Sequence, residues 1–458
     1  MSDLLASLSM ASRALAAQQA GLDATGQNIA NVNTPGYTRR TVDLAASPPL
    51  GPLSAGSGAE VVAIRAERAD LLETQLRHEQ PAQGREAAMA ASLSQIEAAL
   101  GTPGQSIDAS LTQFFNAFSQ LAQDPTSGVA RQQVIVQGQS LTHSFNDVAS
   151  RLASAQRDVD DQVRSSVDQI NALATRIASL DASMSGPAGA SGAEAVRDNL
   201  GVALSSLSKL IDIGVVSRSD GGVDVSIGNG HSLVIGSTAT ALGVSALPVT
   251  GFADLTSGGT NVTAAITGGS IGGLLHVRDG LLPGYTTQLD QLAFGVATSV
   301  NAAHAAGYDL NGTAGGNFFA PLASANGAAA ALSVSNAIVA NGNLIAAAAT
   351  PTPGDNQNAR TITDLRQAVL AGGTTNPVDT WAALVYRVGT DAQVATNDKA
   401  SRDEVVKQLQ TLRDQVSGVS LDEEAANMMR FQRAYEANAR YFSAVETTLN
   451  MLMQALGS

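Results

Sequence analysis

The sequence predicts a mainly α-helical protein with a smaller antiparallel β domain and with paired helices at its two ends. Apolar residues recur every seven positions near both ends of the chain, a spacing typical of helices that pack along their length on other helices. Long stretches between the ends also keep a helical period. Only residues 211–268 alternate apolar and polar side chains around glycine-rich turns, as antiparallel strands do.

The first helix is expected over residues 2–30. Its apolar side chains follow two interleaved registers, and polar residues weaken the second of them. The first register is Leu8, Leu15, Leu22 and Ile29. The companion register is Leu4, Ala11, Gln18, Thr25 and Val32. Such a helix is expected to pack against partner helices, either within one chain or between subunits.

The sequence NVNTPGY ends this helix. Asparagine side chains compete with helical hydrogen bonds, and the proline after Thr34 favours extended geometry at that threonine. Pro35 and Gly36 fit the two central positions of a type II turn, in which the glycine takes a positive φ. Arg39 and Arg40 follow the turn. From these residues alone, an ordinary helix end and a turn shaped for a partner both remain open.

Helical patterns fill most of the middle of the chain. A Pro/Gly/Ser-rich linker over residues 47–58 precedes a short strand-like segment, AEVVAI. Helices are then expected over residues 71–100, 107–123 and 128–184. At about 1.5 Å per residue, the last of these helices is several tens of ångströms long, so it is expected to form a column rather than a compact core element.

The pattern changes at residue 211. Turn sequences at residues 220–222 and 228–230 predict β-hairpins. An irregular stretch rich in Gly, Asn and Ala extends from about residue 307 to about residue 358. Helical patterns are found again over residues 270–306, 361–370 and 381–416.

The C-terminal segment, residues 421–456, has the most regular spacing. Glu424 and Asn438 interrupt its companion register. That register otherwise contains Phe431, Val445 and Leu452. The main register repeats every seven residues without interruption, at Leu421, Met428, Tyr435, Phe442, Leu449 and Leu456. The two ends of the chain therefore carry matching heptad helices.

Composition narrows the classes of function. The chain has 458 residues, which suggests two to four domains. Its net charge of −14 argues against a nucleic-acid partner held by phosphate contacts. It contains no cysteine. No apolar run approaches the roughly 18 residues that span a bilayer, and the N-terminus lacks the basic region of a secretory signal. We therefore expect no membrane insertion and no cleaved signal peptide.

The sequence contains no recognisable catalytic or metal-binding constellation. DLNGTAG, residues 309–315, resembles the start of a calcium loop but has Ala314 where such a loop needs glycine. The acidic residues 422–424 suit the dipole at the first turn of a helix better than acid–base catalysis. The histidines are scattered, at His78, His143, His231, His276 and His304. We expect neither an enzyme nor a cofactor or metal site.

Several motifs resemble a known family. ANVNTPGYTRR, residues 30–40, resembles the signature that rod, hook and hook-associated proteins of the bacterial flagellum share after their N-terminal helix. The C-terminal segment, with an acidic start before FQRAYEANA, resembles their C-terminal helix. Residues 121–146 and 268–319 are similar to stretches of the hook-associated proteins that rod and hook proteins lack. The chain therefore resembles the flagellar axial proteins, and most closely their hook-associated members.

This resemblance implies an architecture. The terminal helices would form a nested, coaxial, coiled-coil-like pair, a helical rod domain would lie outside them, and the antiparallel β domain would project further outward. The terminal helices would comprise residues 1–60 and 417–458, the rod residues 61–209, 269–307 and 359–416, and the outer β domain residues 210–268 and 308–358.

The resemblance also implies function and partners. The chain would be a structural component of the bacterial flagellum that joins hook to filament by axial polymerisation through its terminal helices. Its partners would be copies of itself in a ring or tube, the hook protein below, the next hook-associated protein and the filament above, and an export chaperone near the C-terminal helix. It would be extracellular, exported by the flagellar type III apparatus, and needed for motility.

Subunit contacts are implied for both terminal helices and for the turn. The leucine register of the first helix would face neighbouring subunits and four residues of the last helix, Met428, Tyr435, Phe442 and Leu449. Arg39 and Arg40 would pair with acidic groups such as Asp422, Glu423 and Glu424. The implied interface residues are Leu8, Leu15, Leu22, Ile29, Asn31, Asn33, Thr34, Pro35, Gly36, Tyr37, Leu421, Met428, Phe431, Tyr435, Phe442, Leu449 and Leu452.

Two alternatives remain. The chain could be another axial component, such as a rod protein, a hook protein or a flagellin-like protein. It could also be a secreted enzyme on an export-competent scaffold, although no constellation of residues supports that class.

Overall fold

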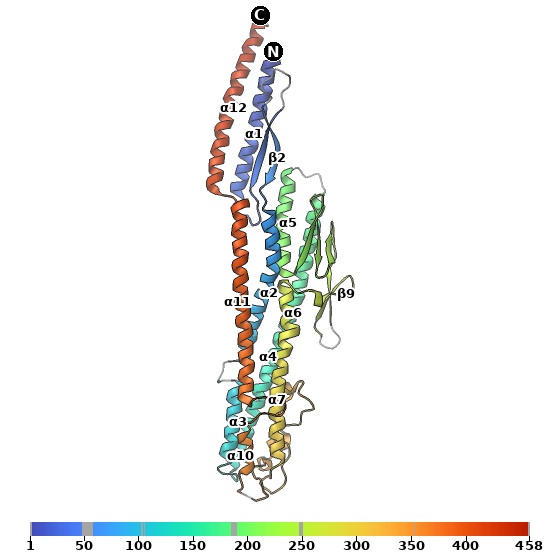
Figure 1. Ribbon diagram of the computed structural model, residues 1–458, viewed down its shortest axis with the longest axis vertical. Helices are drawn as coiled ribbons and strands as arrows, with labels where there is room; N and C mark the ends of the chain where they lie inside the picture. The colour runs from blue at the N-terminus through green and yellow to red at the C-terminus, as the bar shows by residue number, and fades with distance from the viewer. Residues whose placement is uncertain are drawn as a thin grey trace.

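The computed structural model describes residues 2–47, 58–101, 104, 106–184, 190–246, 251–352 and 354–456. The molecule is long and narrow, and both termini lie at the same end of it (Figure 1). It is mainly helical with a smaller β domain, so the predicted fold class is confirmed. Most of the linker expected over residues 47–58 lies outside the described residues. None of the described helices is long and apolar enough to cross a membrane.

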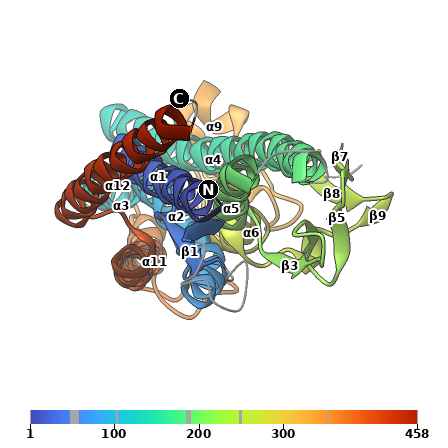
Figure 2. The same cartoon turned by 90° about the horizontal axis from the view of Figure 1, so that it is seen from above.

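One end of the molecule is a small unit made from both ends of the chain. It contains α1 (Ser2–Ala30), β1 (Arg40–Ala46), β2 (Ala59–Ala66) and α12 (Leu421–Leu456), and we call it the terminal unit. β1 and β2 form an antiparallel hairpin. α1 contacts α12 on one side and the hairpin on the other, so that it lies between them when the molecule is seen from above (Figure 2). Both terminal helices have the bounds that the heptad pattern predicted.

The rest of the long axis is a helical rod. Its longest element is α4 (Gly128–Met184), and α2 (Asp70–Leu100), α3 (Ile107–Leu121) and α5 (Ala190–Leu210) pack on different parts of its length. α11 (Pro377–Ser417) packs mainly on α2. These helices share one continuous apolar core. Because each helix buries one apolar stripe against its neighbours, the rod is stabilised by its own side chains along its whole length.

A second set of consecutive helices packs against the other helices of the rod. It consists of α6 (Gly269–His276), a π-helical turn η2 (Val277–Leu281) and α7 (Leu282–Ala305). α6 crosses α2 at close range, because a Cβ on Gly273 would meet the backbone of Arg85. Glycine at this position therefore lets the two backbones approach one another.

The β domain projects sideways from the rod (Figure 1). Three polar side chains of α4 bind its backbone: Asp181 accepts from Val223 N at 2.9 Å, Asn171 from Leu242 N at 2.8 Å, and Asp160 from Ala253 N at 2.7 Å. The strands form two antiparallel sheets, in the orders β3-β4-β5-β6 and β7-β8-β9. Their bounds are β3 (Ile213–Ser217), β4 (Val223–Ile227), β5 (His231–Ile235), β6 (Thr238–Ala239), β7 (Leu242–Ala246), β8 (Ala253–Ser257) and β9 (Thr260–Asn261), followed by the 3-10 turn η1 (Thr263–Ala265).

Residues 308–358 differ from the prediction that they belong to the β domain. They lie at the foot of the rod, against α3, α4 and α7 (Figure 1). Aromatic packing holds them there. Phe318 and Phe319 are fully buried, and the centres of their rings lie 5.5 and 5.6 Å from the centre of the Phe114 ring in α3. The short helices of this region are α8 (Ala328–Ala331), α9 (Asn336–Ala340), η3 (Gly342–Leu344) and α10 (Gln357–Asp364).

His304 links this foot to α7. Its side chain is completely buried, its Nδ1 lies 2.7 Å from Gly316 O, and its Nε2 accepts from Ala346 N at 2.9 Å. Burial lowers the pKa of His304, and the nearby Arg131 lowers it further. The neutral ring with a proton on Nδ1 satisfies both bonds, whereas a protonated Nε2 would oppose the Ala346 N–H.

We therefore expect acid to destabilise the rod partly through His304. Because the pKa is lower in the folded than in the unfolded chain, the unfolded state takes up the extra proton, and stability falls as pH decreases from about 7 to about 5. Replacement His304→Gln is expected to flatten this part of the pH dependence, measured by urea unfolding. His78→Gln, at an imidazole that is 88% exposed, is the control. An unchanged slope in His304→Gln would contradict the assignment.

Candidate subunit interface

The two terminal helices meet through small residues on α1 and large residues on α12. Ala17, Gly21 and Ala24 recur at helical spacing on the buried side of α1. A Cβ built on Gly21 would lie 2.6 Å from the ring of Phe431. Phe431 therefore occupies the space that the missing side chain leaves, and the two helices can pack closely at this point.

The leucine register of α1 does not form this contact. Leu22 comes directly after the buried Gly21, and Ile29 comes directly after the buried Asn28. One residue is a rotation of about 100° around the helix, so both side chains point away from the buried side. Together with Leu8 and Leu15 they are half-buried. The expectation that these four residues face α12 and neighbouring subunits stays a prediction, since the close approach to Phe431 is at Gly21.

Asn28 lies at the centre of a buried polar cluster where α1 ends. Its side chain is 1% exposed and makes four hydrogen bonds. Its Nδ2 donates to Arg40 O at 2.9 Å and to Glu424 Oε2 at 3.0 Å. Its Oδ1 accepts from Arg40 N and from the Tyr37 hydroxyl, each at 2.9 Å. One amide thus connects the end of the first helix, the strand after the turn and the start of the last helix.

Arg39 completes the connection to α12. Its Nε donates to Glu424 Oε1 at 2.8 Å, and its NH1 lies 2.9 Å from Glu423. Its backbone N–H donates to Ser417 O at 2.9 Å, at the end of α11. The predicted pairing of Arg39 with the acidic start of the last helix is therefore present within one chain. We call Asn28, Tyr37, Arg39, Arg40 and Glu424 the joint cluster.

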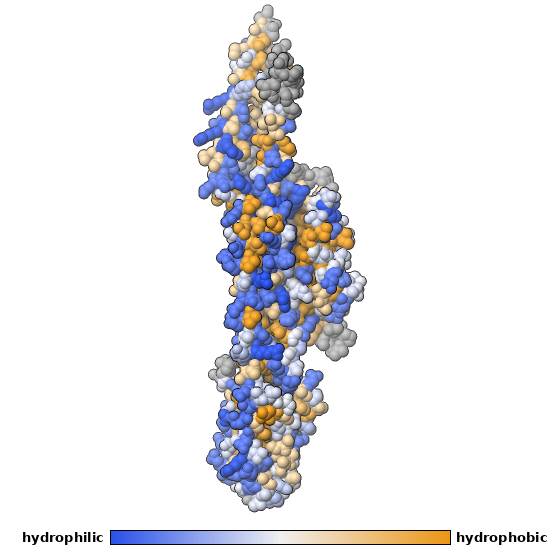
Figure 3. Space-filling model, viewed as in Figure 1, coloured by the Kyte–Doolittle hydropathy of each residue, from blue (hydrophilic) through white to orange (hydrophobic). Residues whose placement is uncertain are grey.

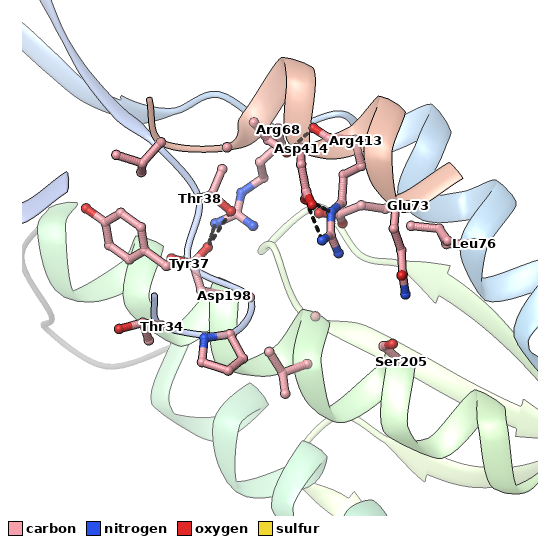
Figure 4. A pocket seen from close by; sticks show the side chains of 18 of the residues that line it. Thr34, Tyr37, Thr38, Arg68, Glu73, Leu76, Asp198, Ser205, Arg413 and Asp414 are labelled. Atoms are coloured by element: carbon pink, nitrogen blue, oxygen red, sulfur yellow. Dashed lines mark hydrogen bonds and ion pairs between the residues drawn. The ribbon is translucent and has the colours of Figure 1, made fainter. Parts of the chain in front are cut away.

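Arg40 turns instead toward the rod. Its guanidinium lies 3.5 Å from Asp198 of α5 and 5.2 Å from the centre of the Tyr37 ring. Asp198 also accepts from Thr38 at 3.0 Å and from Arg68 at 2.7 Å (Figure 4). Two arginines therefore surround one carboxylate that is 10% exposed, which fixes the terminal unit on the rod.

Burial raises the pKa of the Tyr37 phenol. The phenol therefore keeps its proton at neutral pH and remains a donor to Asn28. This matters because Asn28 Oδ1 can only accept, so an ionised Tyr37 would break the joint cluster.

The NTPGY turn has the geometry that its sequence predicts. Tyr37 N donates to Thr34 O at 3.1 Å, and Gly36 has a φ of 78°, as a type II turn requires. Gly36 also contacts Val202 of α5, and a Cβ there would clash with it. The side chains of Asn33, Thr34 and Pro35 are exposed.

A groove of about 640 Å³ lies under this turn. The turn forms one wall, and α2, α5 and the end of α11 form the others (Figure 4). Its lining is mixed in charge and includes Arg68, Glu73, Lys209, Arg413 and Asp414. In the part of the chain that the structure describes, no group of three or more histidine or acidic side chains is placed to hold a metal ion.

The far end of the terminal unit exposes apolar side chains. Met451 is 59% exposed, Met453 57% and Leu5 55%. Met451, Leu452 and Met453 point to different sides of α12, and all three are exposed. Exposed apolar side chains gathered at one place are typical of a surface that takes part in association, so this end of the chain is suited to being covered by other molecules.

Comparisons with known proteins agree with this architecture. A family model described as the flagellar hook-associated protein FlgK helical domain matches residues 93–319. The flagellar basal body rod protein model matches residues 8–38, and the C-terminal model of the basal body rod FlgEFG proteins matches residues 414–455. The two terminal matches cover most of α1 with the turn, and nearly all of α12.

Curated relatives match along the whole chain. Flagellar hook-associated protein 1 of Bacillus subtilis (strain 168) is 28% identical over 504 residues, covering 100% of this chain and 99% of the relative. Flagellar hook-associated protein 1 of Escherichia coli (strain K12) is 29% identical over 537 residues, covering 96% of this chain and 97% of the relative. The chain is therefore similar to flagellar hook-associated protein 1 along nearly its whole length.

A solved structure supports the fold. The flagellar hook junction protein FlgK from Burkholderia pseudomallei aligns with a TM-score of 0.67 and 19% identity, over 75% of this chain and all of that one. The relatives are structural proteins of the flagellum, so the prediction that this chain is not an enzyme is confirmed. The chain is a flagellar component.

The predicted interface residues fall into two groups. On α1 and α12, Leu8, Leu15, Leu22, Ile29, Met428, Phe431, Phe442 and Leu449 are half-buried, whereas Leu421, Tyr435 and Leu452 are exposed. In the turn, Asn31 and Tyr37 are half-buried, and Asn33, Thr34, Pro35 and Gly36 are exposed. The structure brings only part of this set into contact within one chain, and its role between subunits remains a prediction.

Three residues that matter here were not among the predicted interface set. Glu424 interrupts an apolar register, and a buried carboxylate in that position requires a donor, which Asn28 supplies. Gly21 lies in the middle of a helix, where glycine is costly without a packing reason. These two signals were present in the sequence. Asp198 has no local signal, because its partners come from distant segments.

Asn28→Ala is expected to lower the free energy of local unfolding of α1 by about 2–3 kcal/mol. The change removes four hydrogen bonds and leaves Glu424 Oε2 without its amide donor. Hydrogen exchange of the α1 amides measures the effect. Asn33→Ala, at an exposed asparagine of the same turn, is expected to change it by less than about 0.5 kcal/mol. Equal protection of the α1 amides in both variants would contradict the central role of Asn28.

Two glycines of α1 provide a matched test of the helix contact. A Cβ added to Gly26 would have nothing within 4 Å of it, so Gly26→Ala is expected to stabilise the isolated chain by up to about 1 kcal/mol through helix propensity. Gly21→Ala gains the same propensity but must displace Phe431, so we expect net destabilisation. Thermal unfolding of the two variants compares them directly. Stabilisation by both would show that the Phe431 contact does not constrain α1.

Proposed function

We propose that this chain forms the junction between hook and filament by axial polymerisation through α1, α12 and the NTPGY turn. The observation that carries this proposal is the exposed apolar far end of the terminal unit, at Leu5, Met451 and Met453. Several exposed apolar side chains at one end of a molecule are typical of a site of association. Copies of the chain stacked along an axis would cover it.

The rod and the terminal unit differ in a way that supports assembly. The rod has a continuous core of its own. In α12, by contrast, Val445 is the one apolar residue that is buried among the described residues. A tube requires heterologous contacts that do not close on themselves. The terminal unit can supply them, since its exposed faces are different from one another.

The partners follow from this position. We propose copies of the chain around the axis, the hook protein below, and the next hook-associated protein and the filament above. Before assembly, an export chaperone would cover the apolar end of α12. The chain would reach the outside of the cell through the flagellar type III apparatus, without a cleaved signal peptide.

A rod component is the second candidate. It is favoured by the match of both terminal segments to models of rod proteins. The central match, over residues 93–319, is to the FlgK helical domain, and this favours the hook–filament junction.

Electron microscopy of cells that lack this chain separates the candidates. We expect complete hooks without filaments, and filament protein released into the medium. Missing or truncated hooks would place the chain in the rod or hook instead. Normal flagella would contradict both proposals.

The double replacement Met451→Ser, Met453→Ser tests the apolar end directly. We expect the variant chain to be exported but hooks to carry about tenfold fewer filaments, because polar side chains weaken the contact with the next copies. Val129→Ser replaces an apolar residue that is 82% exposed on α4, and it is expected to behave as wild type. Full filament numbers with the double variant would overturn the role of this end.

A further inference from the structure

The terminal unit has two outer faces that lie on opposite sides of α1. One is the side of α12 that points away from α1, and the other is the β1–β2 hairpin with the start of α2. Figure 2 shows α1 between α12 and β1. A copy of the chain can therefore present one face to each of two neighbours.

The outer side of α12 is basic. Arg430, Arg433 and Arg440 are exposed, with Glu436 as the acidic residue among them. Figure 3 shows hydrophilic side chains gathered along this side. Within the described part of the chain, Arg433 and Arg440 form no ion pair. We call Arg430, Arg433 and Arg440 the arginine face.

The hairpin side is acidic. Glu60, Glu67 and Asp70 are exposed, and no arginine or lysine of the described residues forms an ion pair with them. Asp43 and Arg65 neutralise each other at 2.8 Å. We call Glu60, Glu67 and Asp70 the acidic face.

Apolar residues accompany both faces. Met429, beside the arginines, is 53% exposed, and Val62, beside Glu60, is 58% exposed. Val62 has no partner in the pairing of the hairpin, because Asp43 pairs with Ala63 and the next residue, Leu44, pairs with Val61. Val62 is thus the extra residue of a β-bulge, a feature that redirects a side chain.

Arg433 and Glu60 also lie at similar distances from the joint cluster along the long axis of the molecule. Arg433 is twelve residues beyond the start of α12, or about 18 Å along the helix. Glu60 is six residues from Ala66, where the hairpin leaves the joint cluster, or about 20 Å along the strand. Copies side by side with a small axial shift would bring Arg433 to Glu60.

We propose that the arginine face of α12 in one copy docks on the acidic face of the hairpin in the next copy. The occupant of each face is a second copy of this chain, and the argument is their complementary charge together with the similar distances of Arg433 and Glu60 from the joint cluster. Such a contact is heterologous, as an open tube requires. The proposal rests on axial polymerisation and names the surfaces that carry it.

A charge exchange tests this pairing. Arg433→Glu and Glu60→Arg are each expected to reduce the number of hooks that carry filaments by about tenfold, because like charges then meet in the contact. The two changes together are expected to restore filaments to within about twofold of wild type. Both residues are exposed, so circular dichroism is expected to show unchanged folding of each variant.

The controls separate this inference from the proposed function. Arg176→Glu makes the same charge change on α4 and is expected to have no effect. If single charge reversals leave filaments intact while Met451→Ser, Met453→Ser removes them, polymerisation through the terminal unit stands and this docking is wrong. Failure of the double exchange to restore filaments would also overturn it. If neither set of variants changes filament number, the proposed function itself fails.

Discussion

The buried contact between Asn28 and Glu424 is the constraint on which the rest of the structure depends. It joins residues from the two ends of the chain, and the polar side-chain atoms of both residues are paired inside the protein. A buried amide and carboxylate are stable only when their hydrogen bonds are complete. Satisfying them fixes the turn, the start of α12 and the strand after the turn together. That junction then determines how the terminal unit stands on the rod.

The terminal unit and the rod are stabilised in different ways. In the rod, helices surround an apolar core that includes the aromatic side chains at its foot. In the terminal unit, one line of small residues on α1 receives Phe431, and much of the remaining apolar surface is open to solvent. The first arrangement buries its apolar side chains within a single chain. The second leaves apolar surface that the proposed neighbouring copies would cover, which connects the structure of the single chain with its similarity to flagellar proteins.

Much of the fold was predictable from sequence because local patterns set it. The heptad spacing gave the bounds of α1 and α12, and a continuous helical period gave α4 its full length. The glycine turns at residues 220–222 and 228–230 do connect strands. The placement of residues 308–358 failed, because their short, irregular segments carry no period, and the contact of Phe318 with Phe114 joins parts of the chain 204 residues apart.

For the candidate interface, the sequence by itself determined that both ends are helices, that a type II turn follows the first one, and that acidic residues begin the last one. These features depend on neighbouring residues and on backbone preferences. Only the tertiary structure decided which face of each helix is used. The ring of Phe431 occupies the space that the missing side chain of Gly21 leaves. The choice of Asp198 as the partner of Arg40 and Arg68 likewise depends on where distant segments meet in space, which no local pattern encodes.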